Sequence, residues 1–199
     1  MHILSIDFDY FIDADIHTRN NKFPDGIDNK PKEALENDWK EAYLTFPEIK
    51  QIGVIPVFNN VCESLKRLQK GKVLISSTHK DIANLFSFIP LEENLEVTNF
   101  DFHHDNYISS GNTLDCANWV RHLMCSRNSG NTTFTWCKRK DSEVESLIGI
   151  FPYNMTDDCY INRDYDFIFI CFSPEWTPPH LFNQYKQLCL SVSHLEHLN

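Results

Sequence analysis

An apolar run that ends abruptly in charged residues limits most strongly how this chain can fold. Residues 95–100 are typical of a buried strand, and Asp101, His103 and Asp105 follow it at alternate positions. Alternate side chains of extended backbone point to the same side, so these three are expected to converge on one face. Two carboxylates and an imidazole on one face are costly to bury together unless a cation neutralises them. The pattern therefore predicts a metal site at the end of this strand.

A second apolar strand, residues 3–8, ends in the same way. Asp7 and Asp9 lie in the stretch Ser5-Ile-Asp-Phe-Asp-Tyr-Phe-Ile-Asp13 and fall on one side of the strand end. One such pair of aspartates commonly caps a turn, whereas the two patterns in one small chain favour metal binding. Mixed carboxylate and imidazole ligands suit Mn²⁺, Fe²⁺ or Zn²⁺ better than Ca²⁺ or Mg²⁺.

Strand-like and helix-like stretches alternate along the chain. Strands are expected at residues 3–8, 73–75, 95–102, 132–137, 146–151 and 165–172, and helices at residues 32–46, 59–70, 81–88, 112–126 and 181–190. This alternation predicts an α/β fold with a mostly parallel sheet, in which residues 95–102 form the central strand. No repeat or linker divides the chain, so residues 1–199 are expected to form a single domain.

In open parallel sheets, sites form beyond the carboxyl ends of the strands. His79 follows the strand expected at residues 73–75, and Glu175 follows the strand expected at residues 165–172. Both are therefore expected at the same edge as the aspartates. Residues 13–31 are polar and include Pro24-Asp-Gly26, which indicates a loop over the site.

Charge and cysteine usage narrow the class of protein. The formal net charge of −10 argues against nucleic acid and anionic membranes as partners and allows a cationic substrate. The seven cysteines are odd in number and form no C-x-x-C pair, which indicates reduced thiols rather than a disulfide framework. No signal segment or membrane-length apolar stretch is present, so we expect a soluble cytoplasmic protein.

The motifs together resemble those of the arginase–ureohydrolase superfamily. That family carries a histidine after one strand, D-x-H-x-D after another and S-x-D-x-D-x-x-D after a third. The matching stretches here are Ser76-Ser-Thr-His79, Asp101-Phe-His-His-Asp105 and the stretch from Ser5 to Asp13. The S-x-D-x-D stretch comes first in this short chain, whereas in ordinary arginases it follows D-x-H-x-D. With Phe172-Ser-Pro-Glu-Trp-Thr-Pro-Pro179 near its end, the chain is most similar to the compact peptide arginases and their uncharacterised arginase-like relatives.

The resemblance implies a three-layer α/β/α fold and two Mn²⁺ ions per chain, with Fe²⁺ or Zn²⁺ as alternatives. Asp101 and Asp7 would bridge both ions. His79 and Asp105 would complete one site, and His103 and Asp9 the other. Ser110-Gly-Asn112 resembles a family stretch that contacts the amino-acid end of the substrate. Asn106 and Trp176 are further candidates for substrate binding.

The reaction implied by the resemblance converts arginine side chains within a peptide or protein to ornithine and urea. Two metal ions would supply hydroxide at neutral pH. Glu175 would orient the guanidinium, and Asp9 would pass a proton to the leaving amine. Leu114 and Asp115 stand where ordinary arginases have a shuttle histidine, so His104 and His180 are the candidates for proton transfer.

Two other functions remain open from the sequence. One is a related amidohydrolase, such as a deacetylase with a single Zn²⁺, because His103-His104 resembles the paired histidines of those enzymes. The other is a binding module that a metal stabilises without catalysis. The expected partner is an arginine-containing peptide or protein, and association into a homo-oligomer is left open.

Overall fold

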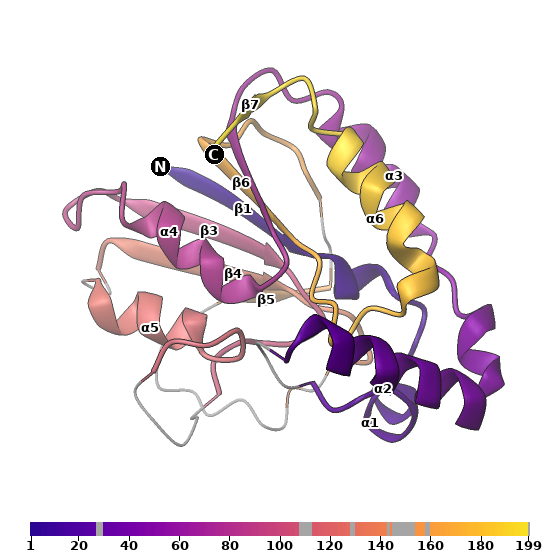
Figure 1. The fold of residues 1–199 in the computed structure, drawn as a ribbon. Coiled ribbons are helices and arrows are strands. Elements are labelled where there is room, and N and C mark those ends of the chain that lie inside the picture. The colour runs from indigo at the N-terminus through magenta and orange to yellow at the C-terminus, as the bar shows by residue number, and fades with distance from the viewer. Residues whose placement is uncertain are drawn as a thin grey trace.

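One parallel sheet forms the centre of the molecule (Figure 1). The computed structural model describes residues 1–26, 30–107, 113–127, 130–142, 144, 154–157 and 160–198. Seven described strands lie in the order β5-β4-β3-β1-β6-β2-β7, and all their pairings are parallel. Their bounds are β1 His2–Asp7, β2 Lys72–Ser76, β3 Leu95–Phe100, β4 Thr132–Cys137, β5 Asn154–Thr156, β6 Phe167–Cys171 and β7 Glu196–His197. The expected α/β class is confirmed, and the central strand is β1 rather than β3.

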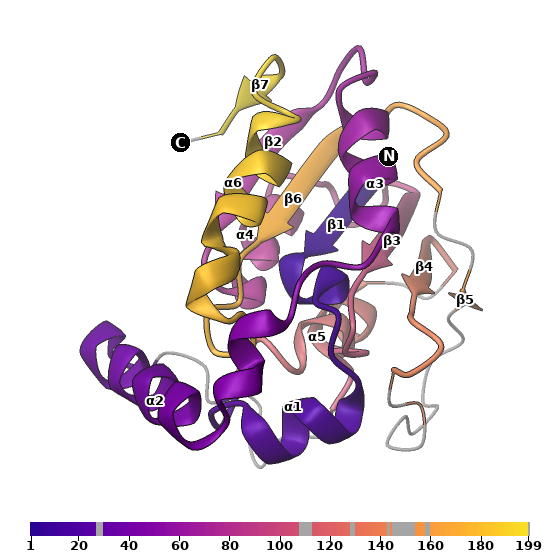
Figure 2. The ribbon, with the colours of Figure 1, turned by 90° about the vertical axis from the view of Figure 1, so that its right-hand side faces the viewer.

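Helices cover both faces of this sheet. α3 (Val57–Leu65) and α6 (Phe182–Leu190) lie side by side over one face, and α4 (Ile82–Phe86) and α5 (Trp119–Ser126) cover the other (Figures 1 and 2). α1 (Ile16–Lys22) and α2 (Lys32–Thr45) lie beyond the carboxyl end of β1 (Figure 2). Short 3₁₀ helices are η1 Phe8–Phe11, η2 Pro47–Gln51, η3 His79–Asp81 and η4 Pro179–Leu181.

The apolar runs of the strands are continuous because both faces of the sheet are buried. In β1, Leu4 and Ile6 pack in the core with α3 and α6, whereas Ile3 packs in the core with α4 and α5. Strand β6 alternates in the same way, with Ile168 on the first face and Phe169 on the second. Burial of these strands holds their carboxyl ends rigidly at one edge.

The expected loop at residues 13–31 contains a helix that the sequence analysis missed. α1 begins after Asp15, whose side-chain oxygen Oδ1 accepts a hydrogen bond from the backbone nitrogen of Thr18 at 2.7 Å. Aspartate is among the best residues for capping a helix in this way. The cap stabilises a helix within a polar stretch that shows no apolar periodicity.

Other expected boundaries differ more modestly. The helix expected at residues 112–126 begins at Trp119, and the strand expected at residues 95–102 ends at Phe100. The strand expected at residues 146–151 lies outside the described residues. No helix in the described ranges is both long enough and apolar enough to cross a membrane.

Candidate metal centre

Neighbouring strands bring the candidate ligands to one edge of the sheet. Asp7 is the last residue of β1 and lies in register with Cys171 of β6, which in turn pairs with Ser76 of β2. Asp9 lies in η1 directly after β1, and His79 opens η3 after β2. The stretch with Asp101, His103 and Asp105 follows β3. The expectation that these side chains meet at the strand ends is confirmed.

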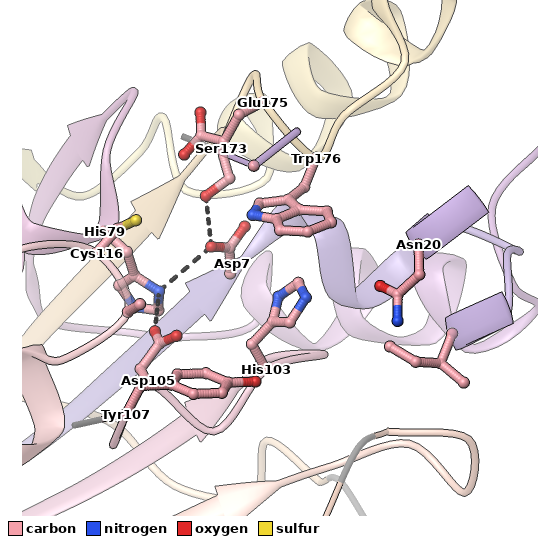
Figure 3. A pocket seen from close by; sticks show the side chains of 13 residues that line it. Asp7, Asn20, His79, His103, Asp105, Tyr107, Cys116, Ser173, Glu175 and Trp176 are labelled. Carbon is pink, nitrogen blue, oxygen red and sulfur yellow. Dashed lines mark hydrogen bonds and ion pairs between the residues drawn. The ribbon is translucent and has the colours of Figure 1, made fainter. Parts of the chain in front are cut away.

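The first group of candidate ligands surrounds the imidazole of His79, and Figure 3 shows two of them, Asp7 and Asp105. The Nδ1 atom of His79 lies 3.3 Å from Oδ2 of Asp7, 3.1 Å from Oδ2 of Asp101 and 3.0 Å from Oδ2 of Asp105. The ring is 1% exposed, and Nδ1 makes no hydrogen bond of acceptable geometry within the described part of the chain. Its other nitrogen, Nε2, lies 2.8 Å from the Ser5 hydroxyl. A buried nitrogen that faces three carboxylate oxygens has the donor set of a transition-metal site.

The second group consists of Asp9, Asp101 and His103. His103 Nδ1 lies 2.9 Å from Oδ2 of Asp9. Within this group, and within the group of Asp7, His79 and Asp101, the ligand atoms all lie within 4.8 Å of one another. Asp101 belongs to both groups, as its expected bridging role requires, whereas Asp7 belongs to the first group alone.

Asp101, His103 and Asp105 do not converge through an extended strand as expected. β3 ends at Phe100, the backbone bends at Phe102 and His103, and Asp105 has a φ of 49°. Positive φ is uncommon outside glycine but is tolerated best by asparagine and aspartate. The tight bend brings Asp105 back toward His79. Asp101 and Asp105 therefore meet at His79 because the chain turns, and not because alternate side chains of a strand point to one face.

Each of three aspartates is held by a neighbour that restricts its side chain. The Ser173 hydroxyl donates to Oδ2 of Asp7 at 2.5 Å, and Trp119 Nε1 donates to Oδ2 of Asp105 at 2.5 Å. Asn99 Nδ2 donates to Oδ2 of Asp101 at 3.2 Å. Such outer partners orient metal ligands and raise metal affinity. The donor set and its support therefore fit a divalent transition metal.

Burial and mutual repulsion raise the pKa values of two of these carboxyl groups. Burial, together with the nearby charge of Asp9, raises the pKa of Asp7 to about 6. Burial, together with the charge of Asp105, raises the pKa of Asp101 to about 8. The raised pKa values mean that ionising these buried carboxyl groups is unfavourable. A bound cation would offset that free energy, because it stabilises the ionised carboxylates.

A pocket opens beside the first group. Its volume is about 220 Å³. Asp7, His79, His103 and Asp105 line it from the strand ends, and Ser173, Glu175 and Trp176 line it from the segment after β6 (Figure 3). The indole of Trp176 lies 4.6 Å from the ring of His103. Glu175 and Trp176 are thus placed where a substrate bound in front of the aspartates would meet them.

Another part of the pocket wall comes from the segment expected to lie over the site. Ile16, Asn20 and Gly26 line the pocket. A Cβ atom at Gly26 would lie 2.0 Å from the Trp176 indole, so only glycine fits there without displacing the ring. The segment after β1 and the segment after β6 therefore meet at the pocket.

Several proposed residues lie elsewhere. His104 is fully buried, with its ring stacked on Tyr107 at 3.9 Å, and does not line the pocket; burial lowers its pKa to about 4. The side chain of Asn106 is buried and also does not line the pocket. His180 contacts Tyr43 and the carbonyl oxygen of Ile52. Ser110 and Asn112 lie outside the described residues. The described geometry therefore does not support a catalytic role for His104.

Asp9 is also less suited to proton transfer than the sequence indicated. It is fully buried and does not line the pocket. Burial by itself would raise its pKa, but the charges of His103 and Arg19 bring the pKa below its usual value. A carboxylate that holds protons weakly is a better metal ligand than a proton carrier.

Arg19, which was not predicted as a site residue, lies against the second group. The side chain is 1% exposed, and Nη1 lies 3.4 Å from Oδ2 of Asp9. Burial lowers its pKa to about 10 despite the opposing effect of Asp9, so the group stays charged at neutral pH. No pattern in the sequence marked this arginine, because it lies in the stretch interpreted as a polar loop. Ser173, Tyr107 and Cys116 were likewise missed as pocket-lining residues.

Comparisons with models of known protein families, with curated proteins and with solved structures found no match to this chain.

The metal-free protein is expected to lose stability as pH rises. The folded-state pKa values of Asp7 (about 6) and Asp101 (about 8) both exceed the unfolded value of 3.8. A carboxyl group shifted this way contributes its full stabilisation below 3.8 and loses it as pH rises through the folded pKa. The contribution of Asp7 should therefore be lost by about pH 6, and that of Asp101 by about pH 8.

Thermal unfolding of chelator-treated protein across this range tests the expectation. Added Mn²⁺ should stabilise the protein more at the upper end of the range, because metal binding requires deprotonated ligands. In Asp101→Asn, the stability of the metal-free protein should depend less on pH at about pH 8, because the group that titrates there is gone. Stability of the metal-free protein that rises between about pH 6 and about pH 8 would contradict the assignment.

Proposed function

We propose that this chain is a metal-dependent hydrolase that converts arginine side chains in a peptide or protein to ornithine and releases urea. One observation carries the proposal. Two carboxylate–imidazole groups share Asp101 and lie beside a pocket whose wall includes the buried carboxyl group of Glu175. That combination suits a reaction in which water attacks a planar cation. An arginase-like fold belongs to the same proposal, and the all-parallel sheet is consistent with it.

The residues divide between holding metal and holding substrate. Two Mn²⁺ ions, one held by Asp7, His79, Asp101 and Asp105 and one by Asp9, Asp101 and His103, would lower the pKa of water and supply hydroxide at neutral pH. Glu175 would accept two hydrogen bonds from the substrate guanidinium and fix its plane. Trp176 would offer an aromatic face to the same cation.

The reaction breaks one carbon–nitrogen bond. Water oxygen joins the guanidinium carbon, and the bond from that carbon to the side-chain nitrogen of arginine breaks. The released nitrogen takes a proton and becomes the ornithine amine, and the carbon leaves as urea. Asp7 and Asp105 line the pocket, so water held by a metal ion beside them would reach the guanidinium carbon from their side.

A peptide substrate should be preferred over free arginine. The pocket wall includes two segments far apart in the sequence, one with Ile16 and Asn20 and the other with Trp176. The net charge of −10 also favours approach of an arginine-bearing peptide. We expect kcat/KM for arginine within a peptide to exceed that for free arginine by about 10-fold or more.

The test is incubation of the Mn²⁺-loaded protein with free arginine, agmatine and an arginine-containing peptide. Urea release and a mass loss confined to arginine are expected with the peptide. The matched peptide with lysine in place of arginine is the control. Equal or higher kcat/KM on free arginine would defeat the peptide preference, and no urea from any substrate would defeat the ureohydrolase assignment.

A second candidate is a metal-dependent amidohydrolase such as a deacetylase. The ion pair between Arg19 and Asp9 favours it, because partial neutralisation of the second group suits a centre with a single ion. The buried position of His104 counts against it, since of the two adjacent histidines only His103 lines the pocket. Release of acetate from an acetyl-lysine peptide by the Zn²⁺-loaded protein, without urea from the arginine peptide, would favour this candidate.

A further inference from the structure

The guanidinium of Arg19 is buried directly against one of the candidate ligands. Nη1 lies 3.4 Å from Oδ2 of Asp9, and Nη2 donates to the backbone oxygen of Asp9 at 2.7 Å. The same side chain donates to the carbonyl oxygens of Ile12 and Ala14, and its Cζ atom lies 3.8 Å above the ring of Phe102. These contacts fix the charge in place and allow little movement away from Asp9.

The two groups of candidate ligands therefore differ in charge. Among the described residues, no lysine or arginine forms an ion pair with Asp7, Asp101 or Asp105. The three carboxyl groups around the Nδ1 atom of His79 therefore have no fixed positive charge that competes with a metal ion. In the second group, the charge of Asp9 is already offset by Arg19. A divalent ion at the second group would also lie close to a fixed positive charge.

We propose that Arg19 makes the two groups unequal. One ion then binds firmly at the first group (Asp7, His79, Asp101 and Asp105), and a second binds weakly at the second group (Asp9, Asp101 and His103). The inference rests on the proposed metal centre and adds the order in which it fills. Charges a few ångströms apart in a protein interior interact strongly, so the two affinities should differ by on the order of 100-fold. The protein would then hold one ion when metal is scarce and two only when metal is abundant.

Titration of the metal-free protein with Mn²⁺ tests the order of filling. The free ion is measured by its electron paramagnetic resonance signal, which reports binding without any substrate. Two separated steps are expected for the unaltered protein. His79→Asn should remove the tight step, and His103→Asn should remove the weak step and leave the tight one. A tight step that survives His79→Asn and is lost in His103→Asn would overturn the proposal.

Variants of Arg19 test the cause. Arg19→Gln removes the charge and should strengthen the weak step by about 10-fold or more, whereas Arg19→Lys keeps the charge and should leave the steps separated. A folded Arg19→Gln variant with unchanged separation would overturn the role of Arg19. If that variant does not fold, the two histidine variants still decide the order of filling.

The outcomes separate this inference from the proposed function. Two steps of equal affinity would overturn the inference and leave the two-ion centre intact. No binding of Mn²⁺ in either step would overturn the metal centre itself, and the inference with it.

Discussion

Asp101→Ala is expected to abolish urea release and to remove most of the Mn²⁺ bound by the protein. Asp101 is the one residue common to both candidate groups, so its loss weakens both ions at once. The loss should exceed the roughly 10- to 100-fold loss that follows removal of an outer partner of a metal ligand. Metal content after dialysis, together with urea release from the arginine peptide, measures the effect.

The metal-free Asp101→Ala variant should remain folded. Burial and the charge of Asp105 raise the pKa of Asp101 to about 8, which means that the ionised side chain is unfavourable in the folded chain without a cation. Its removal should therefore cost little stability at neutral pH, and the stabilisation by Mn²⁺ should disappear. Asp13→Ala is the control, because Asp13 is the last aspartate of the other motif, S-x-D-x-D-x-x-D, but is exposed. Full occupancy by two ions in Asp101→Ala would contradict the shared-ligand assignment.

Glu175→Gln is expected to leave Mn²⁺ binding unchanged and to weaken recognition of the substrate guanidinium. The amide has nearly the same shape as the carboxyl group but lacks the negative charge that pairs with a guanidinium. Glu175 is buried at the pocket wall, so the substrate cation would be left without its counter-charge. Loss of one partner of a buried charge pair lowers kcat/KM by about 30-fold or more.

Two measurements on the same preparation separate recognition from metal binding. Mn²⁺ content and the melting temperature of Glu175→Gln should match those of the unaltered protein, while kcat/KM on the arginine peptide falls. The exposed Glu41 provides the control substitution Glu41→Gln, which should change neither quantity. Unchanged turnover in Glu175→Gln would place guanidinium recognition at another residue.

The meeting of the candidate ligands at one edge could be predicted because it depends on local pattern and on a general property of parallel sheets. Each short apolar run predicted a strand, and the acidic or imidazole residue directly after it predicted a position at the carboxyl end. Parallel pairing then aligns those ends, as the register of Asp7 with Cys171 shows. The contact between His79 and Asp101, which are 22 positions apart, could be predicted because β2 and β3 run in the same direction.

The amino-acid sequence by itself determined the α/β class, the strands β1, β2, β3, β4 and β6, and the edge at which carboxylates and imidazoles gather, since all of these follow from residues near one another in the chain. The short edge strands β5 and β7 were not predicted. Only the tertiary structure decided which way those side chains point. Trp119 holds Asp105, and Ser173 holds Asp7, across separations of 14 and 166 residues. The burial of His104 and the placement of Arg19 against Asp9 likewise depend on packing between distant segments. A local sequence pattern cannot predict such contacts, because they form only when distant segments pack together in the folded chain.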